Sequence, residues 1–133
     1  MTSRLTELAV DCRDAERLAV FWCAVLGFEV IDRKPGMVEI GSWEPTAEAV
    51  RERQMPPTML FIEVPEGKSA KNRLHLDVSP IDCTQDEEVR RLIELGAQPV
   101  EVGQPADCSW RVLQDIEGNE FCVVRSLARG VAN

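Results

Sequence analysis

A chain of 133 residues with 44% hydrophobic content is long enough for one compact domain and too short for two ordinary ones. Its formal net charge of -8 predicts a negative field, which disfavours nucleic acid and anionic membranes as partners. The five cysteines form no CxxC pair, and no apolar run is long enough to span a membrane. We therefore expect a cytoplasmic protein with free thiols.

The first half of the chain predicts a strand, a helix and three further strands. Residues 5–11 are strand-like, and Asp14 is suited to cap the helix that follows. Leu18 and Trp22 lie four residues apart on its apolar stripe, which favours a core role for Trp22. Gly27 is expected to end this helix. Short β-type runs then occupy residues 28–32, 37–43 and 58–64.

The second half of the chain follows the same plan. A strand-like run at residues 74–78 precedes a capping box in which Thr84 leads and Glu87 follows three residues later. Gly96 is expected to end the helix. Short β-type runs again follow, at residues 99–102, 110–114 and 120–125.

This second helix is predicted to be amphipathic. Its buried stripe is expected to contain Val89, Leu92 and Ile93. On the exposed side, Glu87 and Arg91 are four residues apart and can pair across one turn.

The repeated order β-α-β-β-β predicts the fold class. We expect a single α+β domain over residues 1–133, made of two βαβββ modules at approximately 5–64 and 73–126. Each module gives a four-stranded mixed sheet with a helix on one face. If the two sheets curl towards each other, their concave faces enclose a central cleft that suits a small ligand.

The segment at residues 44–57 is longer than a usual connection between two strands. Pro45, Pro56 and Pro57 bracket a stretch, residues 46–54, that can form a short helix capped by Thr46. One interpretation is a lid over the cleft. The alternative is a surface excursion without a role, since loops tolerate insertions.

Three stretches carry a resemblance to a known family. They are DAERLAVFWCAVLGFEV in the first half, NRLHLDV at the start of the second half and VLQDIEGNEFCVV near the end. With them, the chain resembles the vicinal oxygen chelate superfamily, and within it the glyoxalase-like and bleomycin-resistance-like proteins. The resemblance implies the paired-module fold. It does not fix an activity, because the superfamily contains isomerases, dioxygenases, thiol transferases and proteins that sequester drugs.

The resemblance also implies four places for ligands of a divalent metal. In this sequence they are held by Glu7, Ile62, His75 and Cys122. Ile62 offers no donor atom, so the standard centre is incomplete. Glu7, His75 and Cys122 can still form a three-ligand zinc site with an open position. Alternatively, no metal binds, Cys122 acts as a small apolar residue and His75 is hydrogen-bonded in the interior.

Other side chains are candidates for ligand binding or catalysis. His75, the only histidine, can act as a general base beside Glu7. Asp77 follows His75 by two residues and so projects to the same face of a strand. Trp43 and Trp110 can stack against a flat ligand.

Two functions remain open from the sequence. The first is a binding protein that holds a small, partly apolar or aromatic ligand without the standard metal centre. The alternative is a metal-dependent lyase or isomerase of the glyoxalase type that uses Glu7, His75 and Cys122. Because proteins of this family often pair, we also expect a homodimer.

Overall fold

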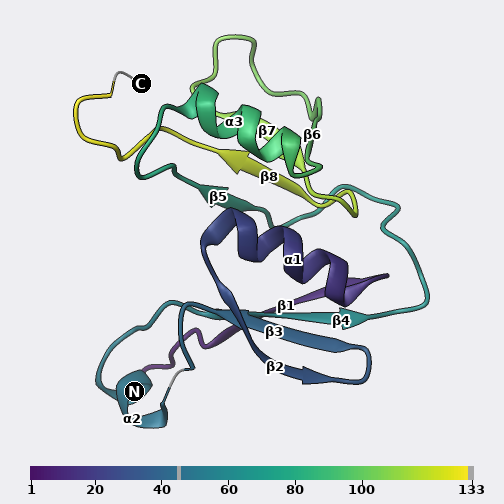
Figure 1. Cartoon of the computed structure of the whole chain (residues 1–133), viewed down its shortest axis with the longest axis vertical. Helices are drawn as coiled ribbons and strands as arrows, with labels where there is room; N and C mark the ends of the chain where they lie inside the picture. The colour runs from purple at the N-terminus through teal and green to yellow at the C-terminus, as the bar shows by residue number, and fades with distance from the viewer. Residues whose placement is uncertain (45, 132–133) are drawn as a thin grey trace. The chain divides into compact units, whose positions relative to one another are not determined.

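Two units make up the computed structural model, which describes residues 1–44 and 46–131. Both follow the order strand, long helix and three strands, and the first has an additional short helix before its last strand. The units are Met1–Gly67 and Lys68–Asn133. Each contains one four-stranded mixed sheet and one long helix (Figure 1). The predicted α+β class, with two βαβββ repeats, is therefore confirmed.

The sheet of the first unit has the strand order β1-β4-β3-β2. Its strands are β1 (Glu7–Cys12), β2 (Glu29–Lys34), β3 (Met37–Gly41) and β4 (Thr58–Glu63). Strands β1 and β4 run parallel, and the other pairs are antiparallel. Helix α1 (Ala15–Leu26) packs against this sheet, where Leu18, Ile40 and Phe61 are fully buried.

The sheet of the second unit repeats this arrangement with the order β5-β8-β7-β6. Its strands are β5 (Leu76–Val78), β6 (Gln98–Pro99), β7 (Arg111–Gln114) and β8 (Glu120–Val123). Strands β5 and β8 are parallel. Helix α3 (Gln85–Glu94) contacts β8, and Leu92, Phe121 and Val123 form the buried centre.

The predicted helix ends are confirmed. Asp14 caps α1 by accepting a hydrogen bond from the Arg17 backbone N–H at 3.0 Å. Gly27 ends α1 in the left-handed conformation, with a φ of 67°. At α3, the side chains of Thr84 and Glu87 form the predicted reciprocal capping box. Local sequence signals therefore fix where both long helices begin.

Two predictions for α3 are wrong. The ion pair of Arg91 is with Glu88, at 2.7 and 2.8 Å, whereas Glu87 Oε2 accepts hydrogen bonds from the backbone N–H and the hydroxyl of Thr84. Ile93 was expected in the buried stripe but is 42% exposed. The buried face instead runs through Glu88 and Leu92, one helical turn apart.

Strand β6 is shorter than the predicted run at 99–102. It consists of Gln98 and Pro99 only. The Val102 N–H donates to the side chain of Gln104 at 2.8 Å, so a local turn takes the place of a ladder hydrogen bond.

The segment at residues 44–57 contains the predicted short helix, α2 (Ala47–Glu52), capped by Thr46. Arg4 donates a hydrogen bond to the Val50 carbonyl at 3.2 Å, and Gln54 donates one to the Leu5 carbonyl at 2.7 Å. These two hydrogen bonds tie the segment to the start of the chain. Pro45, at its beginning, lies outside the described residues. The lid function remains a prediction.

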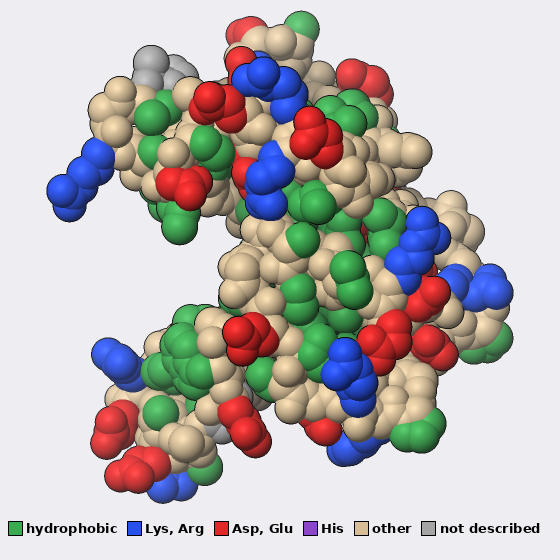
Figure 2. Space-filling view, viewed as in Figure 1, with side chains coloured by type: hydrophobic (Ala, Val, Ile, Leu, Met, Phe, Trp, Pro, Cys, Tyr) green, Lys and Arg blue, Asp and Glu red, His purple; other side chains and the backbone are tan. Residues whose placement is uncertain are grey.

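No helix within the described parts of the chain combines the length and apolar character needed to cross a bilayer. On the face shown in Figure 2, acidic and basic side chains are interspersed.

Candidate functional site

The pairing of β5 with β8 brings three polar side chains to one face of the second sheet. Asp77 lies directly opposite Cys122 in the parallel ladder. His75 precedes Asp77 by two residues, so its side chain projects to the same face. His75 itself lies one residue before β5 rather than within it.

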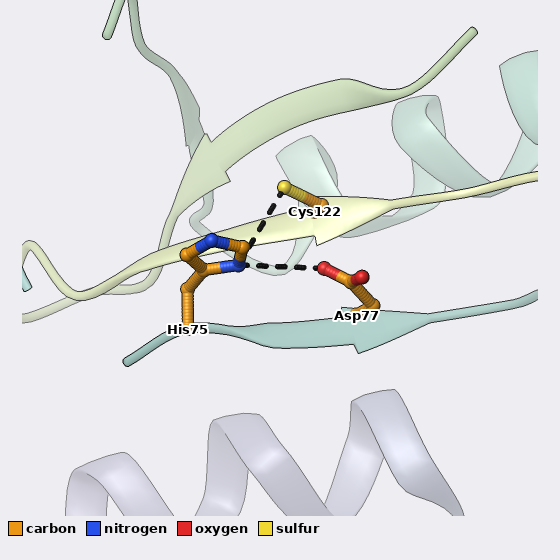
Figure 3. A group of neighbouring side chains, drawn as sticks. All are labelled: His75, Asp77 and Cys122. Atoms are coloured by element: carbon orange, nitrogen blue, oxygen red, sulfur yellow. Dashed lines mark hydrogen bonds and ion pairs between the residues drawn. The ribbon is translucent and has the colours of Figure 1, made fainter. Parts of the chain in front are cut away.

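The three side chains point towards one another (Figure 3). His75 Nδ1 is 3.4 Å from Asp77 Oδ1 and 3.9 Å from Cys122 Sγ. One ligand-type atom from each residue lies within 4.8 Å of the other two. The imidazole is 44% exposed, so His75 does not belong to the core of its unit.

Burial, followed by the nearby Asp77 carboxylate, raises the pKa of the Cys122 thiol to about 11. Cys122 is only 7% exposed. Without a bound cation, this cysteine is therefore a neutral thiol near pH 7 and a poor nucleophile.

A pocket of about 270 Å³ opens beside this group within the second unit. Its lining contains both apolar and polar side chains. The apolar lining comes from Val102, Trp110, Val112, Phe121 and Val124. The polar and thiol lining comes from Lys71, His75, Asp77, Ser109, Glu120 and Cys122. Trp110, one residue before β7, is 36% exposed, and an indole is a side chain on which a flat ligand can stack.

Glu120, which we did not predict from the sequence, anchors the chain segment that leads to His75. Its carboxylate accepts from Lys68 Nζ at 2.8 Å and from the Asn72 backbone N–H at 3.0 Å. Burial opposes ionisation, but the hydrogen bonds from Lys68 and Asn72 outweigh it and hold the pKa of Glu120 below its ordinary value. Glu120 therefore stays charged inside the unit, paired with Lys68.

The remaining predicted site residues belong to the first unit. Glu7 lines a smaller pocket of about 110 Å³ together with Glu39. Burial, and then the charge of Glu39 and a hydrogen bond with it, raise the pKa of Glu7. Ile62 lies opposite Asp11 on the same sheet, and Trp43 follows β3 by two residues and is 45% exposed.

Replacing Glu7 with glutamine is expected to stabilise the protein slightly at pH 7. Because the folded-state pKa of Glu7 is raised, ionisation near Glu39 destabilises the fold as pH rises above the ordinary carboxyl range. The gain in melting temperature should be on the order of 1–2 °C at pH 7 and should vanish near pH 4. Thermal unfolding at both pH values measures it. Glu66→Gln, which changes the net charge equally, is the control, and an equal gain in that variant would contradict the local origin.

The strand registers define how the two units correspond. Asp11 pairs with Ile62 as Asp77 pairs with Cys122, which agrees with the predicted equivalence of Ile62 and Cys122. The same registers place Ala9, two residues before Asp11, at the position of His75. By this measure Glu7 is not the counterpart of His75. The donor set that the resemblance implied does not fit as a whole, because Ile62 cannot coordinate a metal.

The paired βαβββ units define the class of protein, an α+β protein with two similar mixed sheets. A sequence profile of the glyoxalase-like domain family matches residues 7–124. The chain therefore belongs to this family, within the vicinal oxygen chelate superfamily. No curated protein sequence matches it significantly.

Solved structures share this fold. A glyoxalase/bleomycin resistance protein/dioxygenase family enzyme from Burkholderia phytofirmans is 22% identical, with a TM-score of 0.62 over 91% of this chain and 97% of that one. Protein ATC0852 from Agrobacterium tumefaciens is 14% identical, with a TM-score of 0.65 over 95% and 98%. A mutant of the fosfomycin resistance protein FosX from Listeria monocytogenes, complexed with Mn(II), is 12% identical, with a TM-score of 0.64 over 95% and 92%. At these identities the similarity shows the fold alone.

Proposed function

We propose that this protein binds a small, partly aromatic molecule in the pocket of its second unit. The observation that carries the proposal is the pocket's composition: apolar side chains, Trp110 among them, line it together with the polar group of His75 and Asp77. Ligand sites are typically apolar concavities with a few polar groups that orient the ligand. At about 270 Å³, this one suits a compact molecule of one or two rings.

The charges around the pocket indicate which polar group the ligand carries. The negative charge of Glu120 is balanced by its ion pair with Lys68. Lys71 also lines the pocket and adds a positive charge there. An oxygen-bearing group can therefore receive a hydrogen bond from the Lys71 ammonium or the His75 ring while the rest of the molecule contacts the apolar lining. We propose an aromatic or partly apolar compound with a hydroxyl, carbonyl or carboxyl group.

Replacing Trp110 with alanine is expected to weaken ligand binding by about tenfold or more, because a stacked indole supplies much of the contact area in such sites. A library of small oxygenated aromatic compounds is screened by ligand-observed NMR, and the best binder is titrated by calorimetry. Ile93→Ala, which truncates an exposed side chain on α3, is the control and should retain the parent affinity. Equal affinity of the Trp110→Ala protein and the parent would contradict the proposal.

A second candidate function is catalysis on a small oxygenated substrate. It is favoured by the position of the Asp77 carboxylate beside His75 Nδ1. A carboxylate that accepts a hydrogen bond from Nδ1–H keeps the proton on Nδ1 and leaves Nε2 free to act as the base. Incubating the identified binders with the protein and analysing them by mass spectrometry separates the two functions. Turnover that disappears in a His75→Ala variant would favour the enzyme, and unchanged compounds would favour the binding protein.

The cytoplasmic location and the homodimer stay predictions from the sequence.

A further inference from the structure

We propose that His75, Asp77 and Cys122 form a zinc site contained entirely within the second unit. The site differs from the four places that family resemblance implies, because it uses Asp77 and needs neither Glu7 nor Ile62. It shares a pocket with the proposed ligand, but the two proposals rest on different observations.

The first argument is the spacing of the donor atoms. Ligand atoms arranged tetrahedrally around zinc at bond lengths of about 2.0 to 2.3 Å lie about 3.3 to 3.8 Å from one another. The observed separations from His75 Nδ1 are 3.4 Å to the Asp77 oxygen and 3.9 Å to the Cys122 sulfur. All three atoms fall within 4.8 Å of one another. Small side-chain rotations therefore suffice to bring them around one ion.

The second argument is the chemistry of the donors. An imidazole nitrogen, a carboxylate oxygen and a thiolate sulfur are the three ligand types that zinc accepts together. Magnesium and calcium prefer oxygen ligands alone, and a thiolate favours softer ions. Three protein ligands leave a fourth position, and all three residues line the pocket.

The third argument is that strand pairing preorganises the group. Asp77 and Cys122 are direct partners in the β5–β8 ladder, so their side chains share a face without any loop closure. The first unit provides an internal comparison, because the same ladder positions there hold Asp11 and Ile62, with Ala9 at the place of His75. The repeated fold alone therefore does not produce this donor group.

Cobalt(II) titration of the full-length, untagged, reduced and metal-free protein tests the site. Cobalt takes zinc's place and gives visible absorption whose intensity reports coordination number, with a sulfur-to-cobalt charge-transfer band if a thiolate binds. We expect one equivalent to bind with that band, zinc to displace it, and magnesium to leave it unchanged.

Two variants test the ligands Cys122 and Asp77, and two variants of the first unit are controls. Cys122→Ser should abolish the charge-transfer band, and Asp77→Asn should weaken cobalt binding by about tenfold or more. Glu7→Gln and Cys23→Ser, which remove a carboxylate and a thiol of the first unit, should each bind within about twofold of the parent. Because Asp77 is 57% exposed, Asp77→Asn should fold normally, which circular dichroism checks.

Three results would overturn the proposal. They are the absence of a charge-transfer band in the parent, its persistence in Cys122→Ser, and a loss of affinity in Glu7→Gln equal to that in Asp77→Asn. The readout is independent of the proposed ligand, so a failed Trp110 experiment would leave this conclusion standing, and the reverse also holds.

Discussion

Replacing Lys68 with methionine is expected to lower the free energy of unfolding by about 3 kcal/mol at pH 7. The side chains of Lys68 and Glu120 are only 19% and 10% exposed, and their charged atoms are 2.8 Å apart. Methionine preserves most of the packing of the lysine stem but leaves the Glu120 carboxylate buried without its cation. An unpaired buried charge is among the largest penalties that a single substitution produces.

The pH dependence of this effect identifies its cause. Because the folded-state pKa of Glu120 is lowered in the parent, its contribution to stability is present above the ordinary carboxyl pKa of 4.5 and is lost as pH falls through the folded value. Protonation also removes the unpaired charge in the variant. The difference between Lys68→Met and the parent should therefore be largest at pH 7 and should already be smaller at pH 4, because Glu120 in the variant has lost the partner that holds its proton off.

Urea denaturation at pH 7 and pH 4 measures the loss. Lys34→Met is the control, because its partner Asp32 is 3.9 Å away, both side chains are exposed, and the expected change is below about 0.5 kcal/mol. The double variant Lys68→Met with Glu120→Gln should recover much of the lost stability by removing the charge. Equal losses in the single and double variants would show that packing of the lysine stem is responsible instead.

The ion pair between Lys68 and Glu120 also helps to position the His75 segment of the pocket. The other Glu120 oxygen accepts from the backbone of Asn72, three residues before His75. Loss of Lys68 should therefore loosen the segment between Asn72 and β5, which contains His75. Binding of the proposed small molecule and of zinc should both weaken.

The features that the sequence predicted well are those with local causes. Asp14 and Gly27 mark the ends of α1 because capping and a positive φ depend on neighbouring residues only. The capping box of Thr84 and Glu87 is likewise read from a spacing of three. The wrong partner for Arg91 shows the limit of such rules. Spacing alone cannot tell which of two adjacent carboxylates is already engaged in a cap.

The site depended on information that local patterns lack. Asp77 could be placed on the face of His75 from strand alternation, but its position opposite Cys122 requires the register between β5 and β8. No sequence period encodes that register across the intervening helix and two strands. The pairing of Lys68 with Glu120 spans 52 positions and has no local signal either. For these residues the folded structure supplies the evidence.

Replacing Gly96 with alanine is expected to cost about 2 to 3 kcal/mol of stability, more than the same change at Gly27. Both glycines follow a long helix and have positive φ, 112° at Gly96 and 67° at Gly27. The Gly27 value lies in the left-handed region, where an L-residue is disfavoured by about 1 to 2 kcal/mol. The Gly96 value lies outside that region, in a conformation almost restricted to glycine.

Space around the two positions adds to the difference. A Cβ at Gly96 would lie 3.0 Å from the Ile116 Cγ2 atom, whereas none of the described atoms lies within 4 Å of a Cβ at Gly27. The turn that contains Ile116 leads into β8, so relief of the clash would disturb the strand that carries Cys122.

Urea denaturation of Gly96→Ala and Gly27→Ala gives the comparison directly. We expect the Gly96 variant to lose the greater free energy of unfolding. Measured relative to Ile116→Ala alone, adding Gly96→Ala should cost less than it does in the parent, because Ile116→Ala removes the crowded Cγ2 methyl. Equal losses at the two glycines would mean that α3 relaxes at its end. In that event, the positive φ of Gly96 would not determine the direction in which the chain leaves α3 towards β6.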